Sequence, residues 1–458
     1  FDKFNKNNYS VFMQKDLTQG SVGKNLIWFS LPFLLSYFLQ TFYGLADLFI
    51  IGQFNGAEVT TAVSVGSQLM HMVTVIIVGL AAGTTVMIGR SVGAKKTDET
   101  AKGIVNSTIF FLIFSLILCF LLILLVNPIL SVLSVPKESW EQTRLYLLIC
   151  FAGIPAITAY NVIASIFRGL GDSKSPMYFV IAACIINIIV DYVLIGIFDM
   201  KSMGAAIGTV LSQAISVVIS LLYIKKRGLG VKLSKTDFKM DKKTIKAILS
   251  VGFPIAVQDG FIQISFLVIT AIANSRGVAI AAAVGVVEKI IGIMFLIPSS
   301  MLSAVSSIAS QNAGAALHSR AKKTLYYGML ITTVVGLIFS VATQFCSEWL
   351  VGLFTKDSDV IVYGGQYLRS YVFDCIFAGF QFCFSGFFTA YRKSILSFIH
   401  NVISVFTTRI PLCYLATIKY PENLFPMGMA APLGSLLSTI ICLIFFVIFF
   451  RKMKEDKI

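Results

Sequence analysis

The sequence predicts an all-α integral membrane protein with twelve transmembrane helices in two six-helix lobes. The chain of 458 residues is 57% hydrophobic and only 13% charged, a composition typical of polytopic membrane proteins. Its apolar stretches reach the roughly 20 residues that a helix needs to cross a bilayer core. Landmarks in the first half return in the second at offsets of 221 to 224 residues, which indicates an internal repeat.

The first apolar stretch, residues 26–51, contains a single acid, Asp47, and a strongly polar residue, Gln40, two helical turns before it. A carboxylate in a spanning helix costs about 2.5–3.5 kcal/mol by insertion scales. That cost is tolerable when the side chain faces a water-filled cavity or a partner, which makes Asp47 a candidate functional residue. The alternative is a position at the outer end of the helix, with the carboxylate in water.

The remaining spans follow at short intervals, separated by linkers rich in Gly, Asp, Ser and Lys. The polar segment 1–23 precedes them, and its first twelve residues, before Met13, look like an expression remnant or a leader and are left out of the fold. The twelve helices are expected at 26–51, 59–87, 103–126, 143–167, 176–198, 204–225, 245–273, 280–308, 324–350, 361–388, 395–418 and 428–450.

A basic, polar run with no spanning potential divides the twelve helices into two sixes. This gives an N-lobe at 24–226, a cytoplasmic linker at 227–243, a C-lobe at 244–451 and a cytoplasmic tail at 452–458. Because six is even, both lobes enter the membrane from the same side and are expected to be related by a pseudo-two-fold axis along the membrane normal. The repeated landmarks are Pro32 and Pro254, Gly93 and Gly314, Tyr146 and Tyr367, and Met203 and Met427.

The net charge of +15 comes mostly from Lys and Arg in alternate loops. This positive-inside pattern predicts a multi-pass protein with both termini in the cytoplasm, and it argues against a nucleic-acid surface. The cysteines form no CxxC pair, and there are only three histidines, so no metal centre or cofactor is expected from either type. The sequence contains no P-loop, HExxH, GxSxG or TVGYG motif. Secondary transport driven by an ion gradient is therefore favoured over an intramembrane enzyme or a channel.

A second polar group lies on the predicted fifth helix, where Asn187 and Asp191 share a face at a spacing of four residues. An amide beside a carboxylate offers oxygen ligands to a hard cation such as Na⁺, or a hydrogen-bonded proton site. Asn161 and Thr209 are candidate further ligands, although both residue types also form ordinary hydrogen bonds in membrane helices. The alternative for Asp191 is a position near the helix end, from which its side chain reaches the interface.

The second half carries its own charges inside predicted spans. Asp259, Glu288, Asp374 and Arg409 are candidates for the wall of a substrate cavity, and structural charge pairing is the alternative. Glu288 and Lys289 are adjacent in the sequence, so they do not face each other on a helix and each needs a partner from elsewhere.

Several stretches together resemble the MATE (multidrug and toxic compound extrusion) family, from about Met13 to Lys454, and are closer to its DinF-like and MepA-like bacterial members. The resemblance implies two lobes around a central cavity, and export of organic cations in exchange for H⁺ or Na⁺. The stretches are MQKDLTQGSVGKNLIWFSLP, GRSVGAKK, FRGLGDSKSP, NIIVDYVLI with MGAAIGT, VVEKI and SQNAGA.

In DinF-like members an aspartate of the first helix and an Asn and Asp of the fifth form the cation site. The resemblance therefore implies a site for H⁺ or Na⁺ at Asp47, Asn187 and Asp191. Asn161 and Thr209 match the nearby polar residues of that family site less directly. NorM-like members have coupling carboxylates on the seventh and tenth helices, where this chain has Asp259 and Asp374, the latter about one turn early.

The family resemblance also implies a monomeric multidrug antiporter of the bacterial inner membrane that works by alternating access. Its partners would be small organic cations and the lipid bilayer, with no nucleic acid and no cofactor. The rival within the same superfamily is a lipid-linked oligosaccharide flippase. That function calls for an Arg-lined cavity to hold pyrophosphate, whereas the candidate residues here are mostly acidic or polar.

Overall fold

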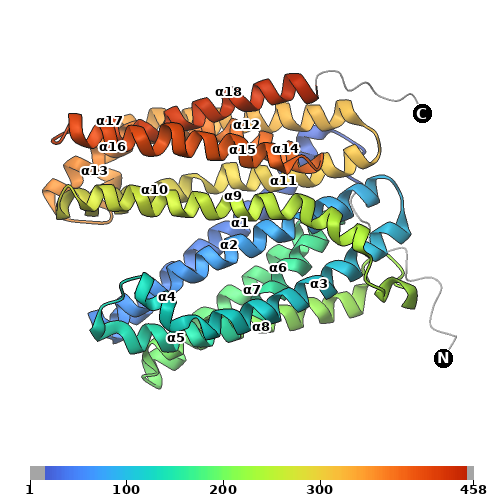
Figure 1. The fold of residues 1–458 in the computed structure, drawn as a ribbon, viewed down its shortest axis with the longest axis horizontal. Coiled ribbons are helices and arrows are strands. Elements are labelled where there is room, and N and C mark those ends of the chain that lie inside the picture. Colours follow the sequence, from blue (N-terminus) through green and yellow to red (C-terminus); the bar gives the residue numbers. More distant parts are fainter. Residues whose placement is uncertain (1–15, 451–458) are drawn as a thin grey trace. The chain divides into compact units, whose positions relative to one another are not determined.

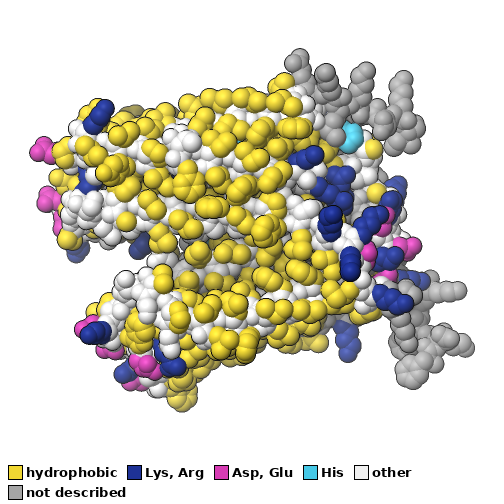
Figure 2. Space-filling model, in the orientation of Figure 1, with side chains coloured by type: hydrophobic (Ala, Val, Ile, Leu, Met, Phe, Trp, Pro, Cys, Tyr) yellow, Lys and Arg dark blue, Asp and Glu magenta, His cyan; other side chains and the backbone are white. Residues whose placement is uncertain are grey.

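The computed structural model describes residues 16–450, apart from the side chains of residues 235 and 236. Most of the predicted N-terminal segment 1–23 and the predicted tail 452–458 therefore lie outside the described residues. Throughout the described range the regular structure is helical, with no strand. Figure 2 shows hydrophobic side chains along the flanks of the helices and charged side chains near their ends, as expected where lipid surrounds the flanks.

The helices follow one another through short turns, as Figure 1 shows. In the first half they are α1 (Val22–Phe54), α2 (Ala57–Gly93), α3 (Thr97–Leu124), α4 (Val126–Val132), η1 (Lys137–Ser139), α5 (Trp140–Ala152), α6 (Ile154–Gly169), α7 (Lys174–Asp191), the π-helix η2 (Tyr192–Ile197) and α8 (Lys201–Arg227). In the second half they are η3 (Lys235–Phe238), α9 (Lys242–Asn274), α10 (Val278–Met294), α11 (Leu296–Gly314), α12 (His318–Gly352), α13 (Ser358–Tyr371), α14 (Asp374–Ala390), α15 (Ser394–Ser404), the π-helix η4 (Val405–Arg409), α16 (Ile410–Lys419), α17 (Phe425–Gly428) and α18 (Ala430–Phe449).

Ten helices of the described chain are long and apolar enough to cross a membrane, and two bent pairs bring the number to twelve. The prediction of twelve spans is confirmed, but the fourth span of each half is broken, where the sequence predicted continuous helices at 143–167 and 361–388. The helical segment Lys137–Ala152, which contains α5, meets α6 at a bend of 48°. Helices α13 and α14 meet at a bend of 45°. Pro155 explains the first bend, because it has no N–H to donate within the helix. At the second bend, Cys375 and Ile376 donate to carbonyls only three residues back, so a tighter turn replaces the α-helix.

The chain forms two compact units whose limits fall inside helices. Unit 1 contains Leu35–Gly252, and unit 2 contains Leu17–Leu34 together with the chain from Phe253 onward. The divisions thus lie within α1 and α9, close to Pro32 and Pro254, the pair of repeated prolines. The lobe limits at 24–226 and 244–451 stay a prediction.

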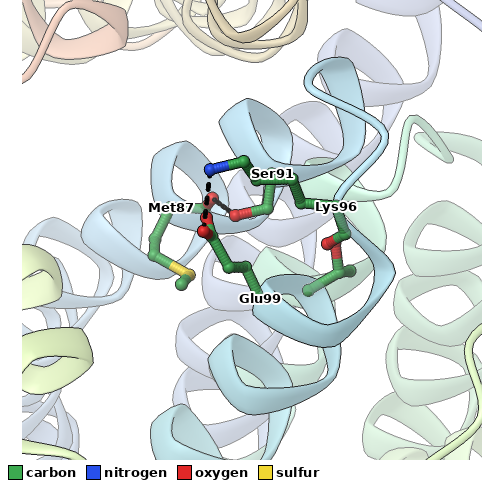
Figure 3. Close-up of polar contacts among 5 residues, drawn as sticks. Met87, Ser91, Lys96 and Glu99 are labelled. Carbon is green, nitrogen blue, oxygen red and sulfur yellow. Dashed lines mark hydrogen bonds and ion pairs between the residues drawn. The ribbon is translucent and has the colours of Figure 1, made fainter.

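The turns of the two halves repeat one another closely. After α2, Lys95 takes a left-handed conformation with φ 57°, and after α11 Ala316 does so with φ 59°, 221 residues later. The turns after α6 and after α14 show the same offset, with φ 89° at Gly171 and 59° at Arg392. The first turn is further held by an ion pair of 2.9 Å between Lys96 and Glu99, as Figure 3 shows. In the same view, the Ser91 hydroxyl donates to the Met87 carbonyl. The repeat predicted from four sequence landmarks therefore extends to the backbone of these two turns.

Within unit 1, α2 and the start of α9 approach each other through two glycines. A Cβ at Gly83 would overlap the Ile248 carbonyl, and a Cβ at Gly252 would overlap the Leu80 carbonyl. Such backbone contact between helices is possible only where side chains are absent, as in small-residue packing of membrane helices. The start of α9 is thereby fixed to unit 1.

The variant Gly83→Ala is expected to destabilise the folded protein by about 1–3 kcal/mol, because the obstacle is backbone and cannot rotate away. The measurement is thermal unfolding of the full chain in detergent. Gly44→Ala is the matched control, since a Cβ at Gly44 has nothing within 4 Å and the exchange favours a helix. Equal melting temperatures for the two variants would contradict the close contact.

Asp241 caps the start of α9 in the same unit. Its carboxylate accepts hydrogen bonds from the Thr244 hydroxyl at 2.6 Å and from the backbone N–H groups of Lys243 and Thr244. Its own N–H donates to the Asn106 side chain on α3 at 2.7 Å. The hydrogen bonds from Thr244 and from the Lys243 N–H hold the pKa of Asp241 below its ordinary value, because they favour the ionised carboxylate.

A pKa lowered by folding means that Asp241 stabilises the folded state fully above the pKa of its unfolded form. This contribution is lost as the pH falls below about 4, through the lower pKa of the folded state. We expect thermal unfolding at several pH values to show a smaller acid-induced loss for Asp241→Ala than for the original chain. An identical acid dependence in the two proteins would rule out this role.

Candidate functional site

Four polar residues predicted from the sequence meet inside unit 1. Asp47 of α1, Asn187 and Asp191 of α7 and Thr209 of α8 lie together, and the first three side chains are almost fully buried. The Thr209 hydroxyl donates to Asp47 Oδ2 at 3.5 Å, and Asn187 Nδ2 donates to Asp191 Oδ2 at 3.4 Å. The Asp47 and Asp191 carboxyls lie close enough to interact with each other's charge. Two acids on different helices therefore face each other across a short gap.

Asp191 is fully buried at a change of helix type in the fifth span. Regular α-helix ends at Asp191, and the wider π-helix η2 continues the span to Ile197. The π-helix is an uncommon element that recurs at functional sites. Because Asp191 has no solvent-exposed surface, the alternative in which it reaches the interface does not describe this structure. The outer-end alternative for Asp47 fails similarly, since only 6% of that residue is exposed.

The structure adds residues that sequence reasoning missed. Gly208 of α8 lies directly against the site, where a Cβ would overlap Asp191 Oδ1 and approach Asn187 Nδ2 to 3.6 Å. Its signal in the sequence was the small-xxx-small spacing with Gly204, which allows helices to pack closely. Tyr43 and Tyr146 lie close enough to Asp47 to interact with its charge. The sequence marked Tyr146 only as a landmark of the repeat, and no pattern singled out Tyr43.

The cluster leaves three buried oxygens without partners. Oδ1 of Asp47, of Asn187 and of Asp191 each lack a hydrogen bond to any described residue. A buried polar oxygen without a partner is costly, and two adjacent carboxylates cannot both carry a charge cheaply in a low-dielectric site. A proton shared between the carboxyls, or a small hard cation bound by carboxylate, amide and hydroxyl oxygens, would remove both penalties. The donor set therefore fits H⁺ and Na⁺.

Two predicted members of the cluster are not brought into it. Gln40 is half-buried on α1 and forms no hydrogen bond with any described residue. Asn161 is buried on α6, but its amide donates to the Ile157 carbonyl of its own helix at 2.8 Å. Asn161 thus satisfies its own helix backbone, and its part in the cation site stays a prediction, as does that of Gln40.

Unit 2 gathers three of the charged residues predicted for the second half. Arg409, the last residue of η4, donates to the Tyr371 hydroxyl, and its guanidinium lies 4.8 Å from the centre of the Phe266 ring. Asp374, the first residue of α14, and Glu288 of α10 lie close enough to interact with the charge of Arg409. No ion pair within 4 Å joins the three in the part of the chain that the structure describes.

The fourth predicted residue of this set, Asp259, is separate from them. It is half-buried on α9, and no hydrogen bond or ion pair to another described residue holds it. The prediction that Asp259, Glu288, Asp374 and Arg409 line one cavity therefore stays open, with Arg409 the centre of a compact cluster and Asp259 apart.

Comparison with known proteins identifies the family. The MatE family model matches the chain twice, at residues 32–193 and 254–415, segments that begin 222 residues apart. The chain belongs to the MATE family. The double match also confirms the internal repeat, and the second match begins at Pro254, as the repeated landmarks predicted.

Relatives and solved structures agree with this assignment. The chain is 28% identical over 400 residues to the probable multidrug resistance protein YpnP of Bacillus subtilis, covering 87% of this chain and 89% of that protein. It is 24% identical over 372 residues to the multidrug export protein MepA of Staphylococcus aureus, covering 80% and 81%. An outward-facing structure of a multidrug resistance MATE transporter shares the fold with a TM-score of 0.90 at 20% identity, covering 96% and 98%.

These findings confirm the predicted resemblance and the two-lobed helical fold. The chain is a multi-pass membrane transporter of the multidrug efflux class, and members of this class are not enzymes. The flippase alternative is not favoured by these relatives.

The variant Gly208→Ala is expected to reduce gradient-driven transport at least about tenfold, because the new methyl group displaces the Asp191 carboxyl by packing alone. The measurement is dye efflux from proteoliposomes, with the melting temperature recorded to confirm folding. Gly52→Ala on α1 is the control, since a Cβ there has nothing within 4 Å. Wild-type efflux by a folded Gly208→Ala protein would show that the close packing has no part in transport.

Proposed function

We propose that this MATE protein is a secondary antiporter that exports lipophilic organic cations in exchange for H⁺ or Na⁺ by alternating access. The coupling site is the cluster of Asp47, Asn187, Asp191 and Thr209 in unit 1. The observation that carries the proposal is the set of three buried oxygens, one from each of the first three residues, that have no partner among the described residues.

The chemistry of this site supports an exchangeable small cation. With H⁺ or Na⁺ bound, the two carboxyls are neutralised and the site is stable inside the membrane. Without the ion, the negative charge must be stabilised by water or by another cation, so an empty site attracts a cationic compound. Exchange requires two conformations that differ in affinity for the ion, because a ligand shifts an equilibrium only by its differential affinity.

The cycle then follows from the state of the carboxyls. On the external side, binding of H⁺ or Na⁺ to Asp47 and Asp191 favours release of the exported cation. On the cytoplasmic side, loss of the ion regenerates the charged site and favours binding of the next cation. Thr209, which donates to Asp47, helps to orient that carboxyl. The positive-inside distribution of Lys and Arg supports cytoplasmic termini in this scheme, and the protein is proposed to work as a monomer in the bacterial inner membrane.

The test is efflux of a cationic dye from proteoliposomes under an imposed pH gradient or Na⁺ gradient. The gradient that accelerates efflux identifies the coupling ion. Asp47→Asn and Asp191→Asn are expected to lose that acceleration, because an amide cannot ionise. Glu138→Gln, which neutralises an exposed acid of the same unit, is expected to behave like the original chain.

Dye binding by the same variants separates coupling from folding. Retained dye binding with lost acceleration supports the proposed role of the two acids. Full acceleration in a folded Asp47→Asn protein would exclude Asp47 from coupling.

A further inference from the structure

Lys289 of α10 is a charged residue inside a membrane span, and it takes no part in the proposed coupling site. It lies eleven residues after the first residue of α10, about 16 Å along the helix axis, in a span that continues through α11 to Gly314. That depth is too great for the side chain to be explained as an end residue at the interface. The residue is exposed, and no hydrogen bond or ion pair to another described residue engages its ammonium group.

The two other cations inside the spans of unit 2 have partners. Arg369 of α13 forms an ion pair of 3.1 Å with Glu348. Arg409 bonds to Tyr371, lies over the Phe266 ring and interacts with the charges of Asp374 and Glu288. Glu288 is consequently turned into this cluster, and its neighbour Lys289 projects from a different face of α10, as adjacent residues on a helix do. Lys289 therefore takes no part in the cluster around Arg409.

The face of α10 that carries Lys289 has small residues next to the charge. Ala282, Gly285 and Gly292 recur at helical spacing and are exposed like Lys289, whereas the exposed apolar residues Val278 and Ile293 lie at the ends of the helix. A Cβ at Gly285 or at Gly292 would have nothing within 4 Å, so the space in front of this face is open. The opposite face, with Val284, Val287 and Ile291, is buried in the core of unit 2.

A lipid-facing helix of the same unit looks different. The exposed residues of α12 include Leu330, Leu337, Val341 and Phe345, all large and apolar. An ammonium group exposed to lipid at this depth is costly, whereas one beside water or a polar ligand is not. The charge of Lys289 at this depth therefore indicates that its face borders water or a polar ligand, and the small residues beside it leave room for a ligand.

We propose that Lys289 binds an anionic group, a carboxylate or a phosphate, of the compound that this protein exports. An ammonium group offers three hydrogen-bond donors and a full charge, which suit such oxygens. The inference rests on the proposed function, because it names a feature of the exported compound. The favoured substrates are therefore amphiphiles that carry an anionic group in addition to the cationic centre of the proposed function.

The test compares binding of two fluorescent probes to the purified full chain in neutral detergent. One probe is a rhodamine with a free carboxylate, and the other is its methyl ester, which keeps the cationic ring system and lacks the anion. Lys289→Gln is expected to weaken binding of the acid about tenfold and to leave binding of the ester unchanged. Lys289→Arg is expected to restore binding of the acid.

The controls separate this inference from a general effect of removing an exposed lysine and from a failure of ion coupling. Lys419→Gln makes the same change at an exposed lysine at the end of α16 and is expected to alter neither affinity. Binding is measured without any gradient, so a failure of ion coupling leaves its outcome untouched. Equal loss of acid and ester binding, or no loss in a folded Lys289→Gln protein, overturns the proposal. The proposal is also overturned if Lys289→Gln weakens binding of phosphatidylglycerol but not of the rhodamine acid, because the anion would then belong to a lipid headgroup.

Discussion

Two carboxyl groups held face to face in a low-dielectric interior constrain the rest of unit 1. Asp47 and Asp191 come from α1 and α7, and neither can stay charged beside the other without a proton, a cation or water between them. Burial of both acids, the amide of Asn187 and the absent side chain at Gly208 all serve to bring these oxygens together. An interaction so costly when unsatisfied is well suited to a device that exchanges one positive charge for another.

The two units solve the problem of buried charge differently, although they repeat the same fold. In unit 2 the acids Glu288 and Asp374 lie near a guanidinium of the protein itself, Arg409, which is held by Tyr371 and Phe266. In unit 1 no lysine or arginine of the described chain forms an ion pair with Asp47 or Asp191, so the positive charge must come from outside. This difference between the units favours unit 1 as the place where the coupling ion binds.

Much of this arrangement was predictable because charge inside a membrane helix is rare and costly. Asp47 and the spacing of Asn187 and Asp191 stand out for that reason, and short linkers made the twelve spans visible. The bend at Val372 and Phe373 had no such signal, since no proline marks it, and it depends on local hydrogen bonding. Asn161 shows another limit: its polarity suggested a ligand, its amide bonds to its own helix, and its part in the cation site stays a prediction. Packing neighbours such as Gly208 and Tyr146 become evident only when helices are placed side by side.

The most direct measurement is the release of ions from the purified protein when a cationic substrate binds. Substrate is added to unbuffered, detergent-solubilised protein, and freed H⁺ or Na⁺ is recorded with ion-selective electrodes. The account predicts release of about one ion per chain that disappears when Asp47 and Asp191 are both replaced by Asn. Substrate binding with no ion release, or the same release without the two acids, would contradict it.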